Sequence, residues 1–495
     1  MTDLAAVAQG VADREQLARL GIKSAFDRRM TKWENFALGF TYLSPVVAVY
    51  SLFGSSLAAG GPPMIWTFVL VGILQYFVAL VFGEVVSQFP ISGGLYPWTR
   101  RLVGKRWAWM TGVIYAAALC VSIAAVATGG APFVARLIGI SASGASVTAL
   151  AIAMIGLTTI INVLGTRLLS HVAMFGFVCE LIGAVAVGGY LMFFGRHQSP
   201  AIVFDSFGAG EGGSYFVPFI TSALGALFCY YGFEACGDVA EETPDPGRTI
   251  PQAMRMTIYI GGIATTFVTF ALLLALPDVR AAISSHDPDT VGTILKASLG
   301  ETGYRVVCGI VLVSFVSCVL SLQAAASRLV FAFARDRMMP LSATLSRLSI
   351  KSQVPVNSLV LVGLVPCAIA LLGLVLANAV TVIISFAVIG IYISFQMLVF
   401  GALIARVRGW RPSGAFNLGA WGWPVNIIAF IGGVSGIVNI AWPRQQGAPW
   451  YVDYMVLLTS AVVVGVAFAF MVIFKPYDVS DTASGDAHLL SSRTV

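Results

Sequence analysis

One acidic residue lies inside an otherwise apolar stretch, where its carboxylate could bind a cation. Residues 214–251 read SYFVPFITSALGALFCYYGFEACGDVAEETPDPGRTIP. The stretch is apolar from Tyr215 to Phe228 and then carries Glu234 where the middle of a membrane span should be. A carboxylate there costs roughly 2.5–3.5 kcal/mol on insertion scales and usually marks a substrate or ion path. The alternative is a kinked structural helix whose Glu234 is satisfied by neighbouring backbone groups.

Aromatic residues and glycines surround this acid. Gly225 and Gly232 weaken the helix on either side of Phe228, Tyr230 and Tyr231. Aromatic faces hold cations by roughly 0.5–2 kcal/mol, so an amine-bearing substrate suits such a site. The span then ends in an acidic loop that contains Glu241, Glu242, Pro244, Asp245 and Pro246. This pattern predicts a discontinuous transmembrane helix at a transport site.

A second interruption lies in the first apolar span, at Ser44-Pro45. Proline removes a backbone donor and clashes with the preceding turn, which frees groups that water or a ligand can satisfy. The interrupted spans are the first and the sixth. They correspond to one another if the chain consists of two five-helix repeats of opposite orientation plus two further helices. Paired interruptions at corresponding positions are the best sequence indication of a transporter's binding site.

A further acid, Glu180, lies in the fifth span with apolar residues on both sides. No basic residue nearby in the sequence can neutralise it. A carboxyl group held near neutrality is what a proton-coupled carrier needs, so Glu180 is the candidate proton-coupling residue. The alternative is a structural carboxylic acid that stays protonated or hydrogen-bonded.

Glu84 lies near the inner end of the second span, ahead of a Pro/Gly loop and a basic cluster. The cluster consists of Arg100, Arg101, Lys105 and Arg106. An ion pair between Glu84 and one of these bases is the simpler interpretation. The alternative is an inner-gate contact that breaks during transport.

Composition identifies an integral membrane protein. Of the 495 residues, 58% are hydrophobic and only 11% are charged, whereas soluble domains are about 25% charged. Twelve apolar stretches are each long enough, at about 20 residues, to cross a bilayer. The fold class is therefore all-α, with about twelve transmembrane helices.

The chain is expected to form one membrane domain with polar ends. The expected parts are a cytoplasmic segment 1–35, a transmembrane domain 36–474 and a cytoplasmic tail 475–495, polar and disordered from Asp478 onward. The two repeats would cover about 36–194 and 215–405, and the extra helices 424–474. With both termini inside, the inner loops and tails hold 23 of the 29 Lys and Arg residues, which supports this orientation.

The stretch after the eighth span grades into an amphipathic segment with Arg328, Arg335, Asp336 and Arg337. This pattern predicts a helix that leaves the membrane and runs along the inner surface. We expect its charged residues to pair with inner-loop acids such as Glu241 or Glu242.

No pattern indicates an enzyme, a cofactor or a metal site. The four histidines are scattered, and no nucleophile elbow, HExxH or P-loop is present. The seven cysteines lie in apolar stretches without metal-ligand spacing. Nothing in the sequence supports nucleic-acid binding. Because no nucleotide site is present, uphill transport would have to use an ion gradient or exchange.

Three stretches resemble the amino acid–polyamine–organocation (APC) superfamily of secondary transporters. They are GEVVSQFPISGGLYPWTRRL, YYGFEACGDVAEETPDPGRTIPQAM and SRLVFAFARDRMMP. AAGGPPMIW followed by SQFPISGGLYPW is similar to the amino acid/choline (GABA permease-like) branch. The resemblance covers about 36–474 and implies a LeuT-like fold of two inverted five-helix repeats, with helices 1 and 6 unwound around a central site.

The resemblance also implies roles for individual residues. The first break would fall at Thr41–Val47, with Thr41, Ser44, Pro45 and Val46 at the substrate, and the second at Phe228–Glu234. Amino acid transporters of the family hold a carboxylate with the free amides of the first break. Since Pro45 has no N–H, an α-carboxylate substrate is less favoured here.

Gate and coupling residues follow from the same resemblance. The cytoplasmic gate would comprise Glu84, Arg100, Glu241, Glu242, Arg335 and Asp336. Glu180 falls near the place where certain proton-coupled members carry a lysine that replaces a sodium ion.

Three functional hypotheses follow. The first is a proton-coupled importer of an amino acid or related small amine, working by alternating access in the plasma membrane as a monomer or homodimer. The second is an exchanger of the same fold that swaps substrate for product. The third is a transport-inactive amine sensor or membrane subunit. GABA, choline, another amine, a polyamine and a neutral or aromatic amino acid all remain possible substrates.

Overall fold

The computed structural model describes residues 2–22, 26–209, 213–284, 289–375, 379–444 and 449–491. These ranges contain helices and no strand. Eleven of the helical segments are long and apolar enough to cross a membrane, and the shorter apolar helix α10 (Phe216–Cys229) occupies the position of the expected sixth span. The all-helical membrane fold is therefore confirmed, whereas the division into two inverted repeats stays a prediction.

The first part of the chain contains nine α-helices. They are α1 (Thr2–Arg19), α2 (Lys32–Leu43), α3 (Pro45–Gly60), α4 (Ile65–Gln88), α5 (Leu95–Leu102), α6 (Lys105–Ile138), α7 (Gly144–Val163), α8 (Thr166–Ile182) and α9 (Gly188–Phe193). A π-helical turn, Gly183–Val187, joins α8 to α9.

The second part begins with α10 and continues through eleven further α-helices. They are α11 (Ala235–Asp238), α12 (Pro246–Leu274), α13 (Val279–Ser284), α14 (Thr290–Arg335), α15 (Ser342–Leu345), α16 (Val356–Val375), α17 (Ala379–Val407), α18 (Gly422–Ala441), α19 (Trp450–Asp453), α20 (Met455–Phe474) and α21 (Ala487–Ser491). Short 3-10 turns lie at Pro62–Met64, Pro200–Phe204, Ala240–Glu242, Gly419–Trp421 and Pro476–Val479.

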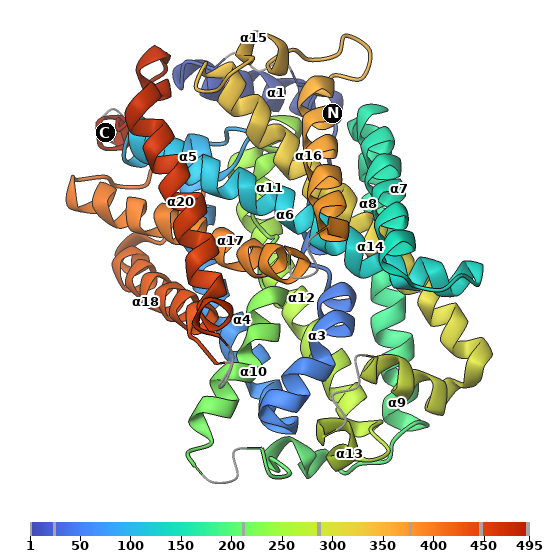
Figure 1. Cartoon of the computed structure of the whole chain (residues 1–495). Coiled ribbons are helices and arrows are strands. Elements are labelled where there is room, and N and C mark those ends of the chain that lie inside the picture. Colours follow the sequence, from blue (N-terminus) through green and yellow to red (C-terminus); the bar gives the residue numbers. More distant parts are fainter. Residues whose placement is uncertain are drawn as a thin grey trace.

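The interrupted helices lie at the centre of the molecule. In Figure 1, α3, α10 and α12 lie between α7 on one flank and α18 and α20 on the other. In the membrane-length segment formed by α2 and α3, 83% of the apolar window is buried, against 17% for α20. The helices that would be the least stable alone are thus enclosed by their neighbours, which can satisfy the backbone groups freed at each break.

The predicted surface helix after the eighth span is wrong. The segment does not run along a surface as a helix of its own: it continues α14 as far as Arg335, and most of it is buried in the protein. Arg328, in this segment, is fully buried and forms an ion pair with Glu242. Because its charge is neutralised inside the protein, the helix has no need of the water surface.

The C-terminal tail is described as far as Ser491 and packs against the rest of the protein, contrary to the expected disorder beyond Asp478. Both ends of the described chain lie at the same end of the molecule (Figure 1). The tail packs against the basic segment that follows α4. Gly485 N–H donates to Arg100 O over 2.9 Å, and Arg101 pairs with Asp486 at 2.6 Å. A polar tail is held here because bases of the neighbouring loop bind its acid and backbone.

Candidate functional site

The first helix break lies at Ser44, between α2 and α3. Ser44 adopts a left-handed conformation (φ 43°), and its N–H donates to Phe40 O, which ends α2. Its hydroxyl oxygen accepts the Val47 N–H at 3.3 Å and caps α3. Pro45 occupies the first position of α3, where a missing N–H is tolerated. The Ser-Pro pair therefore ends one helix and starts the next within a single residue.

The second break follows α10, which ends at Cys229, and α11 begins only at Ala235. Gly232 lies between them with φ 109°, a conformation that disfavours a side chain. A Cβ atom at Gly232 would lie 2.7 Å from the Leu43 backbone nitrogen. The two breaks are therefore in direct contact at the centre of the protein.

Glu180 reaches the first break from α8. Its Oε1 accepts a hydrogen bond from the Ser44 hydroxyl at 2.6 Å and from the Val46 N–H at 3.0 Å. The side chain is fully buried, and Oε2 has no hydrogen-bond partner among the described residues. The candidate coupling residue thus bonds directly to the backbone of the unwound helix.

Glu234 caps the second break. Its Oε2 accepts the Gly232 N–H at 2.8 Å, and its Oε1 accepts the hydroxyl of Tyr115 at 3.0 Å. Tyr115 lies on α6, and no feature of the sequence indicated it. The carboxylate and the glycine two residues before it form a local bond that stabilises the non-helical turn.

Asp238 is a buried acid that the sequence reading did not single out. It lies four residues after Glu234, at the end of α11, and is fully buried. In the described part of the chain neither of its carboxyl oxygens has a hydrogen-bond partner. The spacing of four residues between two acids in an apolar stretch is the signal that could have revealed it.

Two of the three predicted aromatic residues lie together. The Tyr231 ring lies 6.0 Å from that of Tyr42 and 5.5 Å from that of Phe228, each edge to face. Tyr230 is placed elsewhere, with its hydroxyl end against Gly72 of α4. There it lines a crevice of about 690 Å³ between α4 and α12. The structure therefore separates Tyr230 from the other predicted site residues.

Thr41 lies one turn before the first break and faces α14. Its hydroxyl lies 2.8 Å from that of Ser321 and donates to Ala37 O at 2.9 Å. The contact with Ser321 links α2 to α14 beside the break.

Ion pairs join bases of α14 to the acids that follow α11, as the sequence predicts. Arg335 pairs with Glu241 at 2.8 Å, and Arg328 pairs with Glu242 at 2.8 Å. In the second pair both partners are buried. The gate acids that follow α11 are thus neutralised by bases of α14.

Arg100 and Asp336 form a third pair in this gate. The Tyr96 hydroxyl also donates to Asp336, at 2.8 Å. Burial lowers the pKa of Arg100 to about 10, so its guanidinium keeps its charge at neutral pH. Five of the six predicted gate residues therefore lie in one network of ion pairs between α5, α14 and the segment after α11.

Glu84 lies apart from this network. Its partner is Arg406 of α17 and not one of the basic residues after α4. Glu84 Oε1 also accepts the Leu418 N–H at 2.9 Å, and Arg406 Nε donates to Asn426 at 3.3 Å. The expected partner was wrong because α4 presents Glu84 to α17 and α18, which follow much later in the sequence.

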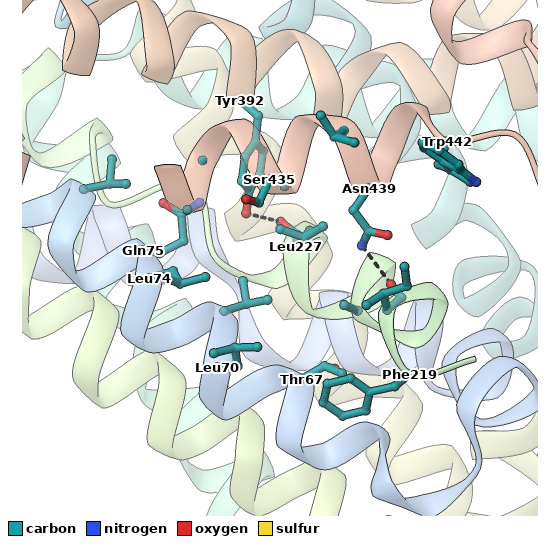
Figure 2. A pocket seen from close by; sticks show the side chains of 18 of the residues that line it. Thr67, Leu70, Leu74, Gln75, Phe219, Leu227, Tyr392, Ser435, Asn439 and Trp442 are labelled. Atoms are coloured by element: carbon teal, nitrogen blue, oxygen red, sulfur yellow. Dashed lines mark hydrogen bonds between the residues drawn. The ribbon is translucent and has the colours of Figure 1, made fainter. Parts of the chain in front are cut away.

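A separate cavity of about 250 Å³ lies beside the breaks, between α4, α10, α17 and α18. Figure 2 shows its largely apolar wall, with Leu70, Leu74 and Phe219 facing the same space as Gln75. The Tyr392 hydroxyl at this wall donates to Leu227 O over 3.0 Å. None of the predicted substrate-binding residues lines this cavity.

Comparisons with known proteins agree with this architecture. Residues 33–468 match the family described as amino acid permease. The chain is 28% identical to the amino-acid permease BAT1 homolog of Oryza sativa subsp. japonica over 83% of this chain and 84% of the relative. It is 25% identical to amino-acid permease BAT1 of Arabidopsis thaliana over 84% and 86%. It is also 26% identical to the low-affinity putrescine importer PlaP of Escherichia coli K12 over 69% and 74%.

The family match covers nearly all of the membrane-spanning part, including both helix breaks and the predicted gate residues. The relatives are transporters and not enzymes, and small molecules are their substrates. This multi-span helical protein therefore belongs to the amino acid permease family, within the amino acid–polyamine–organocation superfamily.

Proposed function

We propose that this protein is a proton-coupled permease that imports an amino acid or related small amine across the plasma membrane by alternating access. The observation that carries the proposal is the contact between the two helix breaks. There Glu180 bonds to the Ser44 hydroxyl and the Val46 N–H at a buried position. Unwound helices with free backbone groups are the usual binding site of secondary transporters.

In this proposal the substrate binds between the breaks. Phe228 and Tyr231 pack against its apolar part, and backbone groups from Thr41 to Val46 and around Gly232 bind its polar part. Glu234 fixes an ammonium group. Tyr230 is left out of this site, because its hydroxyl end lies against Gly72 of α4.

Glu180 carries the coupling proton. A buried carboxylate without an ion-pair partner is costly, so its charge is neutralised most readily by a proton. Proton binding changes which hydrogen bonds the carboxyl can accept from Ser44 and Val46. The state of the first break thereby responds to the proton, which is the requirement for coupling.

Alternating access requires the cytoplasmic pairs to break and re-form. The pairs Arg335–Glu241, Arg328–Glu242 and Arg100–Asp336 hold this side closed. Buried charges that lose their partners must be rehydrated, so opening is possible only if water enters the cavity. Both termini then lie in the cytoplasm, in keeping with the distribution of Lys and Arg.

The proposal is tested by uptake into proteoliposomes. Radiolabelled putrescine, agmatine, arginine and a neutral amino acid are offered to empty vesicles under an inside-alkaline pH gradient. An importer accumulates at least one of them, and a protonophore abolishes the accumulation. Uptake that requires preloaded vesicles would indicate an exchanger, and retention that never exceeds one molecule per protein would indicate a sensor.

A further inference from the structure

The backbone N–H groups at the start of α3 are all accounted for. Pro45 has no N–H, the Val46 N–H donates to Glu180 and the Val47 N–H donates to the Ser44 hydroxyl. The next N–H, that of Ala48, donates to Ser44 O at 3.1 Å. A helix normally begins with unsatisfied donors, and this one has none left for a ligand.

That no N–H is left matters because the N-terminus of a helix is a natural binding site for an anion. The positive end of the helix dipole and the exposed N–H groups together favour a carboxylate or phosphate. At α3 the carboxyl group of Glu180 occupies this site. The Ser44 hydroxyl also donates a hydrogen bond to Glu180 Oε1, over 2.6 Å. A carboxylate on the substrate would have to displace Glu180 to reach the Val46 N–H.

The second break follows the same arrangement. The Gly232 N–H donates to Glu234, whose other carboxyl oxygen accepts from the Tyr115 hydroxyl. Here too a carboxylate of the protein occupies the N–H that a substrate carboxylate would use. At each break a carboxyl group of the protein therefore already accepts a backbone N–H.

The remaining groups around the breaks favour positive charge. α2 and α10 both end at the breaks, and a helix carries a partial negative charge at its C-terminal end, on carbonyl groups that lack helical partners. Glu180, Glu234 and Asp238 are fully buried. None of the three forms an ion pair within the described part of the chain, whereas the neighbouring acids Glu241 and Glu242 both do.

From this arrangement we infer that the substrate is an organic amine without a carboxylate group, such as an aliphatic diamine or polyamine. The inference rests on the proposed transport function and narrows it. Ammonium groups can bind to carbonyl oxygens, to the carboxyls of Glu234 and Asp238 and to the face of Tyr231. GABA and the amino acids carry a carboxylate for which no N–H at the start of α3 is left.

Two pairs of compounds test the inference, because the members of each differ only in the carboxylate. Agmatine is compared with arginine, and putrescine with ornithine, by the shift in melting temperature of the purified protein and by direct binding. We expect each amine to bind at least about tenfold more tightly than its amino acid partner.

Variants of Glu180 make the test specific to the first break. In Glu180→Ala the Val46 N–H is released, so we expect the affinity for arginine and ornithine to rise by about tenfold. Glu180→Gln keeps an acceptor oxygen of the same size at the break, so no such gain is expected. The Gln variant therefore separates release of the N–H from loss of the charge, and gel filtration shows whether each variant is folded.

The outcomes separate the inference from the proposed function. Arginine binding as tightly as agmatine to the unaltered protein would overturn the inference and leave an amino acid permease. If Glu180→Ala is folded and gains no affinity for amino acids, the role of Glu180 as a substitute carboxylate is wrong. If none of the four compounds binds, the inference fails; the proposed function fails only if the neutral amino acid of the uptake experiment is not transported either.

Discussion

The carboxyl group of Glu180 is hydrogen-bonded directly to the first helix break. It belongs to α8 but accepts hydrogen bonds from Ser44 and Val46, on either side of the interruption between α2 and α3. Oε2 is buried without a partner in the described chain, so it is the free position for a proton. A change at this single oxygen alters the attachment of α3 to α8, which is how a proton could be coupled to movement of the broken helix.

Replacing Glu180 by Gln should abolish the pH dependence of uptake. Glutamine keeps the size and an acceptor oxygen, but it cannot exchange a proton in this pH range. We expect uptake by Glu180→Gln to be about tenfold slower under a proton gradient and unchanged between two external pH values. The measurement is the initial rate in proteoliposomes at both pH values.

A surface acid provides the control for this variant. Glu301 pairs with Arg305 on an exposed turn, so Glu301→Gln removes one carboxylate without touching the break. It should transport like the unaltered protein. Uptake by Glu180→Gln that keeps its full pH dependence would contradict the coupling role.

At the scale of helices, the contact between the two breaks is the central feature. The sequence indicates both interruptions, because Ser44-Pro45 and Gly232 are residues that end or bend helices. It also suggests Gly225 as a weak point, but Gly225 lies inside α10 and only allows close packing against Ser56 of α3. Which glycine breaks a helix and which one packs depends on neighbouring helices that local sequence does not specify.

The long-range partners could not be predicted for a related reason. Tyr115 and Arg406 bind the acids Glu234 and Glu84 from helices that lie more than one hundred residues away in the chain. The pairs between α14 and the acids after α11 were predictable, since the charges on each side are obvious and few others are available. The course of α14 was not predictable from the sequence, because a buried ion pair allows an arginine-bearing helix to remain inside the protein.

Replacing Gly232 by Ala should force the two breaks apart. The residue has φ 109°, and a Cβ atom there would lie 2.7 Å from the Leu43 nitrogen. We expect a loss of stability of about 1–3 kcal/mol and loss of transport, because both backbone strain and a collision are introduced. The measurement is the melting temperature together with uptake.

Gly189 is the matched control. It lies in α9, and a Cβ atom there would meet nothing within 4 Å. Alanine at this position should leave stability unchanged or raise it slightly, since alanine favours a helix. Equal effects of the two substitutions would show that contact between the breaks is unimportant.

Over the whole molecule, one side is closed by ion pairs and by both ends of the chain. This closure is therefore built from segments far apart in sequence, which include α1, α5, α14 and the C-terminal tail. Arg28, in the segment after α1, pairs with Asp13 at 3.3 Å and donates to Thr243 O at 2.8 Å. Burial lowers the pKa of Arg28, and the segment is held close to the gate. Opening this side must displace several such contacts together.

Breaking the buried gate pair should cost far more than breaking an exposed one. In Arg328→Ala, Glu242 is left buried without its main partner, and about 3–5 kcal/mol of stability should be lost. Arg305→Ala removes an exposed pair and should cost about 0–1 kcal/mol. Thermal unfolding of the two variants gives the comparison, and equal melting temperatures would contradict a closed, dry gate.

Releasing the tail should loosen the inner closure. Asp486→Asn removes the charge that binds Arg101, so we expect faster limited proteolysis of the tail and of the loop beside α5. Asp478→Asn changes an exposed acid of the same tail and should have no such effect. If the Asp486 variant is cut as slowly as the Asp478 variant, the ion pair does not hold the tail.

The most direct measurement of the central claim is a cryo-EM map of the protein with putrescine bound. We expect ligand density between Ser44 and Gly232, with an ammonium group within hydrogen-bond distance of Glu234, and the Glu180 contact to Val46 intact. Density confined to the cavity beside Gln75 and Tyr392 (Figure 2) would contradict it, because the substrate would then bind away from both helix breaks.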